Sequence, residues 1–353
     1  MNKKTCYLFI FLVFIMAMTV CAACSGQLPD LVPEEKLSVN IMPLSIATAS
    51  STENAIAFDE GEFVVAKETT LEPTLVPLAS GPAVITVLTP VASGSVVYQN
   101  AKVAIDASNT KDGYVMVRFL AGGTAKIKVL ITGSSGVTYT YNLKNSGAYE
   151  VFPLSDGSGN YTIAVYQNVT GTKYATAYST TISVNLTDQF APFLRPNQYV
   201  NFTSASKAVV YGAELVKSSP DVLSKVGVIY KYVIKNYTYN TKLAATVTSG
   251  YLPNLDAFFD KKSGICFDYA ALMTAMLRSQ NIPTKLVVGY TGKAYHAWIS
   301  VYTEAGGWLD NVIFFNGAEW KLMDPTFASS SKSSESIMKY IGNGENYSAK
   351  YLY

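Results

Sequence analysis

Histidine, cysteine and charge are all scarce in this sequence. Its 353 residues include one histidine and four cysteines, and 15% of them are charged. A zinc site needs several His, Cys or carboxylate ligands, so the sequence predicts no metal site of the His/Cys type and no other cofactor. The net charge of +2 gives no basic surplus for a nucleic-acid partner. Neither a P-loop nor a dinucleotide-binding fingerprint is present.

The cysteines concentrate at the start of the chain. Cys6, Cys21 and Cys24 fall in the first 24 residues, and Cys266 is the single thiol of the remainder. A lone cysteine cannot form an internal disulfide. Cys266 is therefore either a buried apolar residue or a reactive group.

Residues 1–24 resemble an export signal. A lysine pair precedes an apolar run, Tyr7–Val20, which is shorter than the ~20 residues that a membrane-spanning helix needs. Two alanines precede Cys24, as in a bacterial lipobox, although Cys21 stands where that pattern usually has leucine. We predict that Cys24 is lipidated, with ordinary cleavage near the same point as the alternative. The protein is then expected on the extracellular face of the bacterial cell membrane, or secreted if no lipid is added.

Composition divides the next 166 residues into two segments. Residues 25–80 hold nine acids and two lysines and are rich in Ser, Thr and Pro, which predicts a disordered acidic tether. A small β-element near residues 62–66 is the alternative there. From 81 to 190, short alternating apolar runs between Gly, Asn and Ser clusters are typical of an immunoglobulin-like β-sandwich. This segment shows no catalytic cluster and is expected to be a spacer or a binding module. Its expected strands include 114–120, 126–131, 138–143 and 161–167.

Helical periodicity begins in the last segment, 200–353. Ser219, Pro220 and Asp221 predict a helix start with Ser219 as the N-cap, and apolar residues follow at spacings of three and four. A second helix is expected to begin at Cys266 and to end near 279–281. A helix followed by antiparallel strands is an α+β arrangement. The strands are expected at 286–290, 295–302 and 320–323.

Cys266 and His296 form the candidate catalytic pair. At the start of a helix, the dipole and the backbone N–H groups favour a thiolate, and the same N–H groups can bind an oxyanion. His296, the single histidine, is expected on the strand over 295–302, on the side opposite the core. A lone histidine is more often structural, but its nearness to Cys266 in the sequence favours a general base.

A carboxylate is needed to orient the imidazole and to stabilise its cation. Asp324 follows the strand expected at 320–323, and Pro325 ends that strand. Asp310 is the competing residue. We predict Asp324 as the third member of the site.

Together these residues resemble the transglutaminase-like core, a papain-type fold. The resemblance covers about residues 205–330 and implies Cys266 as nucleophile, His296 as base and Asp324 as the orienting residue. Two departures are the apolar run 299–301 after the His-Ala-Trp element and an insertion at 310–318. The matching residues are Gly264, Cys266, Asp268, Tyr269, Ala270, Leu277, Arg278, Ile282, Pro283, Gly289, Tyr290, His296, Ala297, Trp298, Trp320, Asp324, Pro325 and Thr326. Among these, Asp268, Tyr269 and the Ile282-Pro283 pair are implied to be structural.

The implied function is acyl transfer by a cell-surface thiol enzyme. Its substrate is expected to be a protein or peptide amide, and contact with the cell wall is a further expectation. If water completes the reaction the enzyme is a cysteine peptidase or amidase, which we favour; if a lysine amine does, it is a cross-linker. The alternative is a catalytically silent, transglutaminase-like surface adhesin or wall-binding protein. In a third hypothesis the chain is a structural surface protein. Its β-sandwich binds the partner, and the thiol domain only adjusts that binding.

Overall fold

The computed structural model describes residues 83–353, except 293, 305, 310–312, 316–319 and 323–346. The predicted signal, the predicted lipid-anchor residue Cys24, the predicted tether and Asp324 therefore lie outside the described residues, as does the competing Asp310. Within the described ranges, no helix is both long and apolar enough to cross a membrane.

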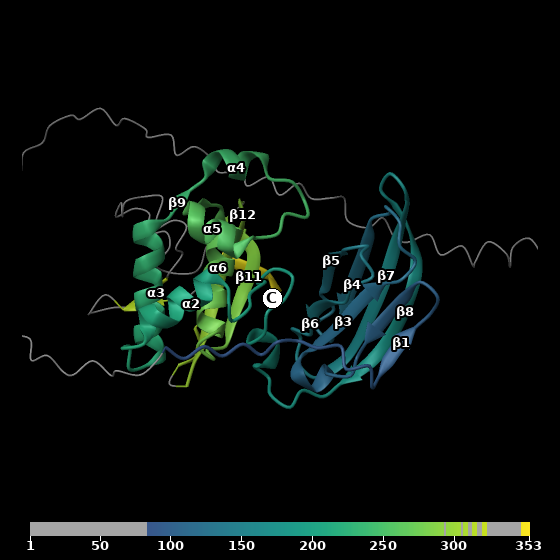
Figure 1. Cartoon of the computed structure of the whole chain (residues 1–353), viewed down its shortest axis with the longest axis horizontal. Coiled ribbons are helices and arrows are strands. Elements are labelled where there is room, and N and C mark those ends of the chain that lie inside the picture. The colour runs from purple at the N-terminus through teal and green to yellow at the C-terminus, as the bar shows by residue number, and fades with distance from the viewer. Residues whose placement is uncertain (1–82, 293, 305, 310–312, 316–319, 323–346) are drawn as a thin grey trace, which may run out of the picture. The chain divides into compact units, whose positions relative to one another are not determined.

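Residues 97–184 form two four-stranded antiparallel sheets (Figure 1). One has the strand order β1-β2-β3-β6 and the other β5-β4-β7-β8. Alternation turns every second side chain of β4 and β5 into the core, as a half-buried sheet requires. The strands are β1 (Val97–Gln99), β2 (Val103–Asp106), β3 (Tyr114–Phe119), β4 (Ile127–Thr132), β5 (Thr138–Leu143), β6 (Glu150–Pro153), β7 (Gly159–Thr170) and β8 (Lys173–Val184).

The predicted strands of this region are present with small changes in their bounds. Expected strand 138–143 coincides with β5, whereas expected strand 161–167 is part of the longer β7. β7 extends because it pairs with β8 along almost its whole length, through two register shifts. The two-sheet arrangement is thus observed, and the immunoglobulin-like type of sandwich stays a prediction.

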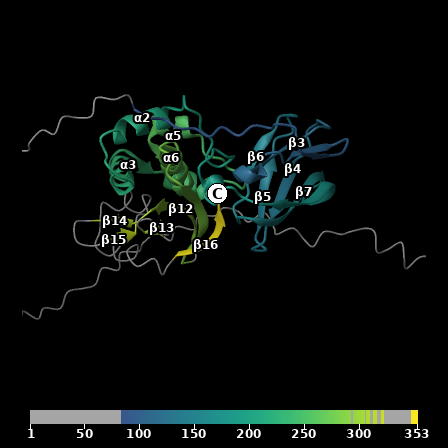
Figure 2. The same ribbon diagram turned by 90° about the horizontal axis from the view of Figure 1, so that it is seen from below.

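Short helices and a third four-stranded sheet follow. The sheet has the order β13-β12-β11-β16, and helices α2, α3, α5 and α6 lie on one side of it (Figure 2). The helices are α2 (Lys207–Val216), α3 (Val222–Asn236), α4 (Thr241–Thr246), α5 (Leu255–Lys261) and α6 (Cys266–Arg278). The strands are β9 (Thr238–Tyr239), β10 (Ser263–Gly264), β11 (Thr284–Thr291), β12 (Ala294–Thr303), β13 (Gly307–Leu309), β14 (Ile313–Phe315), β15 (Trp320–Leu322) and β16 (Tyr347–Leu352).

The start of α3 differs from the prediction. Its N-cap is Asp221, not Ser219, because the Asp221 carboxylate accepts hydrogen bonds from the backbone N–H and the hydroxyl of Ser224, at 2.8 Å each. Pro220 therefore precedes the cap and is not the first helical residue. The predicted apolar face, Val222, Val226, Ile229 and Val233, is confirmed for the last three, which are buried, while Val222 is half-buried.

Helix α6 begins at Cys266, and its C-cap is Ser279, both as predicted. All thirteen residues of α6 are buried, its polar and charged residues included. α6 packs against β11, β12, α2, α3 and α5, so neighbouring elements cover every side of it. A helix enclosed in this way is the central element of the domain.

Candidate active site

The candidate nucleophile is the first residue of the central helix. Cys266 is 2% exposed and is a free thiol. It follows β10, which pairs in parallel with β9, so the chain enters the helix from a fixed strand. The first backbone N–H groups of any α-helix have no partner inside the helix. The thiol therefore stands where the helix offers donors for a negative charge.

The turn before Cys266 is held by Asp268. Its Oδ2 accepts a hydrogen bond from the Ile265 N–H at 2.8 Å, and its Oδ1 accepts one from the Tyr251 hydroxyl at 2.7 Å. This is the carboxylate half of a capping box, since Ile265 has no polar side chain of its own. Gly264 leaves room for it, because a Cβ there would lie 2.6 Å from Asp268 Oδ2 and 2.6 Å from the Phe258 ring.

Burial dominates the electrostatics of Asp268. The side chain is 2% exposed, and this desolvation raises the pKa of its carboxyl, opposed by the hydrogen bonds from Ile265 and Tyr251. The same surroundings raise the pKa of Tyr251, first through burial and then through its hydrogen bond to the carboxylate. The structural role that the resemblance implies for Asp268 is thus visible as a cap on the helix that carries the thiol.

The far end of α6 is fixed by a buried guanidinium. Arg278 is 1% exposed, and burial lowers its pKa to about 9, so it keeps its charge at neutral pH. It donates to Thr284 O from Nε and Nη2, to Tyr353 O from Nη2 and to Arg195 O from Nη1, at 2.6–2.9 Å. These bonds tie the helix to β11 and to the residue after β16, so α6 is anchored at both ends.

His296 is the third residue of β12 and is 5% exposed. Its ring stacks on Trp298, with centroids 6.2 Å apart, and Tyr347 meets Trp298 edge-on at 5.2 Å. The facing residue in β11 is Gly289, where a Cβ would lie 2.9 Å from the Trp298 ring. The nearest neighbour of that Cβ would be the backbone oxygen of Ser348 in β16, so the glycine lets both β16 and the Trp298 ring lie close to β11.

Both sides of β12 are covered, which differs from the prediction of one core side. Ala297, Ile299 and Val301 belong to the core cluster that also contains the apolar residues of α6. Alternation assigns His296, Trp298 and Ser300 to the other side, as predicted, yet all three are buried. α6 and β12 pack on each other, so Cys266 and His296 come from adjacent elements. The pairing of their side chains stays a prediction.

Tyr251 is the residue that sequence reasoning missed. It lies in the loop between α4 and α5, 17 positions before Asp268, and no periodicity marks it. One weak signal is its neighbour Gly250, whose φ of 88° requires a glycine and so indicates a fixed turn. Helices α2, α4 and α5 and strand β16 were not predicted either.

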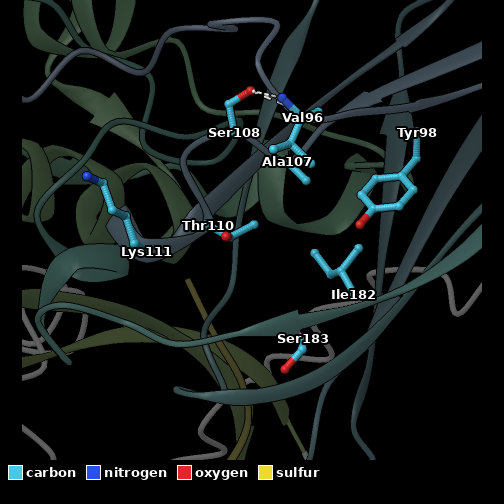
Figure 3. A pocket seen from close by; sticks show the side chains of 8 residues that line it. All are labelled: Val96, Tyr98, Ala107, Ser108, Thr110, Lys111, Ile182 and Ser183. Atoms are coloured by element: carbon cyan, nitrogen blue, oxygen red, sulfur yellow. Dashed lines mark hydrogen bonds between the residues drawn. The ribbon is translucent and has the colours of Figure 1, made fainter.

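A shallow cavity of about 250 Å³ occurs elsewhere, in the sheet region (Figure 3). It lies between β1 and β8, and it contains none of the predicted site residues. Within the described parts of the chain, no cluster of three or more His, Cys, Asp or Glu could hold a metal ion. The cavity is lined by Val96, Tyr98, Ala107, Ser108, Thr110, Lys111, Ile182 and Ser183.

A family model and two curated relatives match parts of this chain. Residues 210–311 match the family model described as transglutaminase-like superfamily. The uncharacterised protein YebA of Bacillus subtilis is 28% identical over 116 residues, which are 27% of this chain and 16% of YebA. The protein-glutamine gamma-glutamyltransferase of Pseudomonas aeruginosa is 32% identical over 87 residues, which are 21% of this chain and 13% of that protein.

The matches to these two curated relatives span only 16% and 13% of the relatives' own lengths. Among solved structures, a proposed cysteine protease from Cytophaga hutchinsonii aligns at a TM-score of 0.35 and 13% identity, over 73% of this chain and 83% of that chain. The matched range holds helix α6 with Cys266 at its start and strand β12 with His296. Residues 210–311 of this chain are therefore a domain of the transglutaminase-like superfamily.

Proposed function

We propose that this protein is a cysteine-dependent acyl-transfer enzyme with Cys266 as its nucleophile. One observation carries the proposal: the single thiol outside the first 24 residues is the first residue of a buried central helix in a transglutaminase-like domain. The strand packed against that helix carries the single histidine of the chain. The first turn of a helix favours a thiolate, so this placement supports a reactive cysteine over a structural one.

The proposed chemistry has two halves. The Cys266 thiolate attacks the carbonyl carbon of an amide, and the negative charge moves to the carbonyl oxygen, where backbone N–H groups of the first turn of α6 stabilise it. The tetrahedral intermediate collapses to a thioester, and the amine leaves with a proton from His296. His296 then takes a proton from water or from an acceptor amine, which attacks the thioester and releases Cys266. Asp324 would hold the imidazole in the tautomer that this exchange needs.

The second half decides between a peptidase or amidase and a cross-linker. The relative from Pseudomonas aeruginosa is named a protein-glutamine gamma-glutamyltransferase, which makes the glutamine carboxamide the first substrate class to test. Hydrolysis remains the outcome that we favour for this chain. It requires that water reach the thioester, whereas cross-linking requires a site that admits a lysine amine and excludes water.

Turnover of a glutamine-containing protein tests this proposal. Full-length protein is incubated with casein and a fluorescent primary amine, and a matched sample carries Cys266→Ala. Covalent attachment of the amine indicates cross-linking, while ammonia release or new chain ends without attachment indicate hydrolysis. Both activities are expected to disappear in Cys266→Ala and to fall at least about 100-fold in His296→Ala, the usual size of a general-base effect. Turnover that survives in Cys266→Ala contradicts the proposal.

We also propose that a lipid on Cys24 holds the enzyme at the outer face of a bacterial membrane, where it can meet proteins or wall peptides. The support is the lysine pair, the apolar run and the alanine pair before Cys24. Expression with a radiolabelled fatty acid is expected to label the wild-type chain. Cys24→Ser should lose the label and move from the membrane fraction to the medium. Equal labelling of the two chains would contradict lipidation at this residue.

A silent scaffold is the second candidate function, and one observation favours it. His296 is nearly fully buried and stacks on Trp298, on the side of β12 that faces away from the core cluster shared with α6. That environment also suits a structural histidine in a surface adhesin. In that case His296→Ala would lower stability without changing the reactivity of Cys266.

A further inference from the structure

We propose that Tyr251 is a positioning residue for the Cys266 thiol and acts through Asp268. The inference rests on the proposed function, because it concerns how the first turn of α6 is held for chemistry at Cys266. It adds a residue that is not among those on which the resemblance rests, contributed by the loop between α4 and α5.

The chain of contacts is direct. The Tyr251 hydroxyl donates to one oxygen of Asp268 at 2.7 Å, and the other oxygen accepts from the N–H of Ile265 at 2.8 Å, the residue just before Cys266. Each carboxylate oxygen is therefore engaged by one donor, one from the loop and one from the turn. Removing the loop donor leaves the carboxylate held from one side only, so the turn that presents Cys266 loosens.

The position of Tyr251 is itself restricted by its neighbours. It is half-buried, its ring lies 6.5 Å from the ring of Phe267, and the preceding Gly250 adopts a φ of 88°. A Cβ at Gly250 would lie 2.8 Å from the side-chain amide nitrogen of Asn142 in β5, so the loop has little freedom on that side. A fixed loop with one hydroxyl aimed at a buried carboxylate is a preorganised support.

The hydrogen bond between Tyr251 and Asp268 also affects the electrostatics around Cys266. Asp268 lies two residues after Cys266, so an ionised carboxylate there opposes a thiolate in the same turn. The hydrogen bond from Tyr251 disperses part of that charge. The acids of the adjacent helix α5 are engaged elsewhere, since Asp256 and Asp260 both accept hydrogen bonds from Lys207. His296 on β12 is the titratable group that the proposed function pairs with Cys266.

The test compares two tyrosine hydroxyls. Full-length protein with Cys6, Cys21 and Cys24 replaced by Ser, so that Cys266 is its single thiol, is alkylated with iodoacetamide from pH 4 to 9. Tyr251→Phe keeps the ring and removes the hydroxyl. Tyr161→Phe is the matched control, because its hydroxyl donates to Gly157 O at 2.8 Å in the sheet region. In parallel, hydrogen exchange is measured for peptides that contain the Ile265 amide.

Tyr251→Phe is expected to slow alkylation at pH 6 about tenfold and to move the midpoint of the rate profile to higher pH, the effect of one hydrogen bond to a charged group. Exchange of the Ile265 amide should also become about tenfold faster, while Tyr161→Phe changes neither readout. The double variant Tyr251→Phe/Asp268→Ala should match Asp268→Ala alone, because alanine leaves no oxygen to accept from the Tyr251 hydroxyl.

A lowered thermal midpoint with an unchanged alkylation profile would show that Tyr251 is merely structural, and would overturn the inference. An unchanged profile together with unchanged exchange at Ile265 would overturn it as well. If the alkylation profile of the wild type still depends on His296, either result leaves the proposed function unaffected. A wild-type thiol that reacts only near pH 8.5, with or without His296, contradicts the proposed function itself.

Discussion

The sheet region, residues 97–184, and the region around α6 treat polar side chains in opposite ways. In β5, Thr138, Thr140 and Asn142 are exposed while the residues between them are buried, so polar groups face water. Helix α6 instead buries Asp268, Thr274 and Arg278 together with its apolar residues. Among the described residues, Asp106 is the one buried polar or charged side chain within 97–184, and the others lie at 197–303.

The difference shows that the region around α6 buries polar side chains at a cost in folding free energy. A buried polar group costs free energy unless a specific partner satisfies it. The sheet region carries some of that cost, since the buried Tyr141 hydroxyl has no hydrogen-bond partner among the described residues, but Asp106 is its one buried charged side chain. The transglutaminase-like domain instead buries a charged side chain at each end of the helix that carries Cys266. Substitutions that remove partners should therefore have large effects around α6 and small effects in the sheets. Matched pairs of substitutions test this contrast.

The largest effect is expected for the buried arginine. Arg278→Met removes the donors to three backbone carbonyls and should cost about 3 kcal/mol or more, because the acceptors stay buried. Its counterpart Arg118 in β3 is half-buried and lies over the ring of Tyr149 at 4.5 Å. Arg118→Met should cost less than about 1 kcal/mol. Urea unfolding of both variants checks this, and equal losses would contradict the contrast.

Two glycines give the next pair. Gly264→Ala would place a methyl group 2.6 Å from Asp268 Oδ2 and should cost about 2 kcal/mol, because the turn before Cys266 must shift. Gly227 lies within α3, and a Cβ added there would have no neighbouring atom within 4 Å. Gly227→Ala should stabilise the protein by about 0.5–1 kcal/mol. Thermal denaturation separates the two, and a loss at Gly227 as large as at Gly264 would be the unexpected result.

The contribution of Asp268 to folding stability should decrease as pH rises, the opposite of the usual trend for a carboxyl group. Burial raises the pKa of Asp268, so the folded state binds its proton more tightly than the unfolded chain. Its contribution to stability is then full below about pH 4, the ordinary carboxyl pKa, and is lost as pH rises through the folded pKa. The stability difference between wild type and Asp268→Asn should therefore be larger at pH 4 than at pH 7, as measured by urea unfolding.

Asp221, the N-cap of α3, is the control with the opposite sign. Hydrogen bonds from Ser224 lower the pKa of Asp221, so its contribution is present above the ordinary carboxyl pKa and is lost as pH falls. The difference between wild type and Asp221→Asn should then shrink from pH 7 to pH 3. The same trend in both variants would show that burial does not control Asp268.

The smallest effect concerns two threonines. Thr274 in α6 is fully buried, and its hydroxyl has no hydrogen-bond partner among the residues that the structure describes. Thr274→Val should stabilise the protein by about 1 kcal/mol, since it removes an unsatisfied polar group. Thr162 in β7 is exposed and pairs with Thr181 at 3.2 Å. Thr162→Val should change stability by less than about 0.5 kcal/mol, as expected of a surface site.

The sequence predicts local features of this fold well. Alternating residues between turn clusters were enough to locate β5, and the helix that was expected to start at Cys266 does begin there. These signals are local, because capping and alternation depend on near neighbours in the chain. The choice of Ser219 over Asp221 as N-cap failed because both residue types suit that position, and side-chain geometry decides between them.

Long-range contacts are the part that could not be predicted. The hydrogen bond of Tyr251 to Asp268 and the bonds of Arg278 to Arg195 and Tyr353 join residues 17, 83 and 75 positions apart. Nothing in local periodicity encodes such partners. The coverage of β12 on both sides was missed for the same reason. Of the candidate site, the sequence supplied Cys266 and His296, while Asp324 lies outside the described residues.

The most direct test of the account is the reactivity of the thiol. Full-length protein with Cys266 as its single cysteine is alkylated with iodoacetamide from pH 4 to 9, beside His296→Ala and the surface control Thr162→Val. We expect reaction already near pH 5–6 in wild type and control, and loss of that low-pH reactivity in His296→Ala. Reaction that begins only near pH 8.5 in all three proteins, the ordinary range of a cysteine, would contradict an activated Cys266.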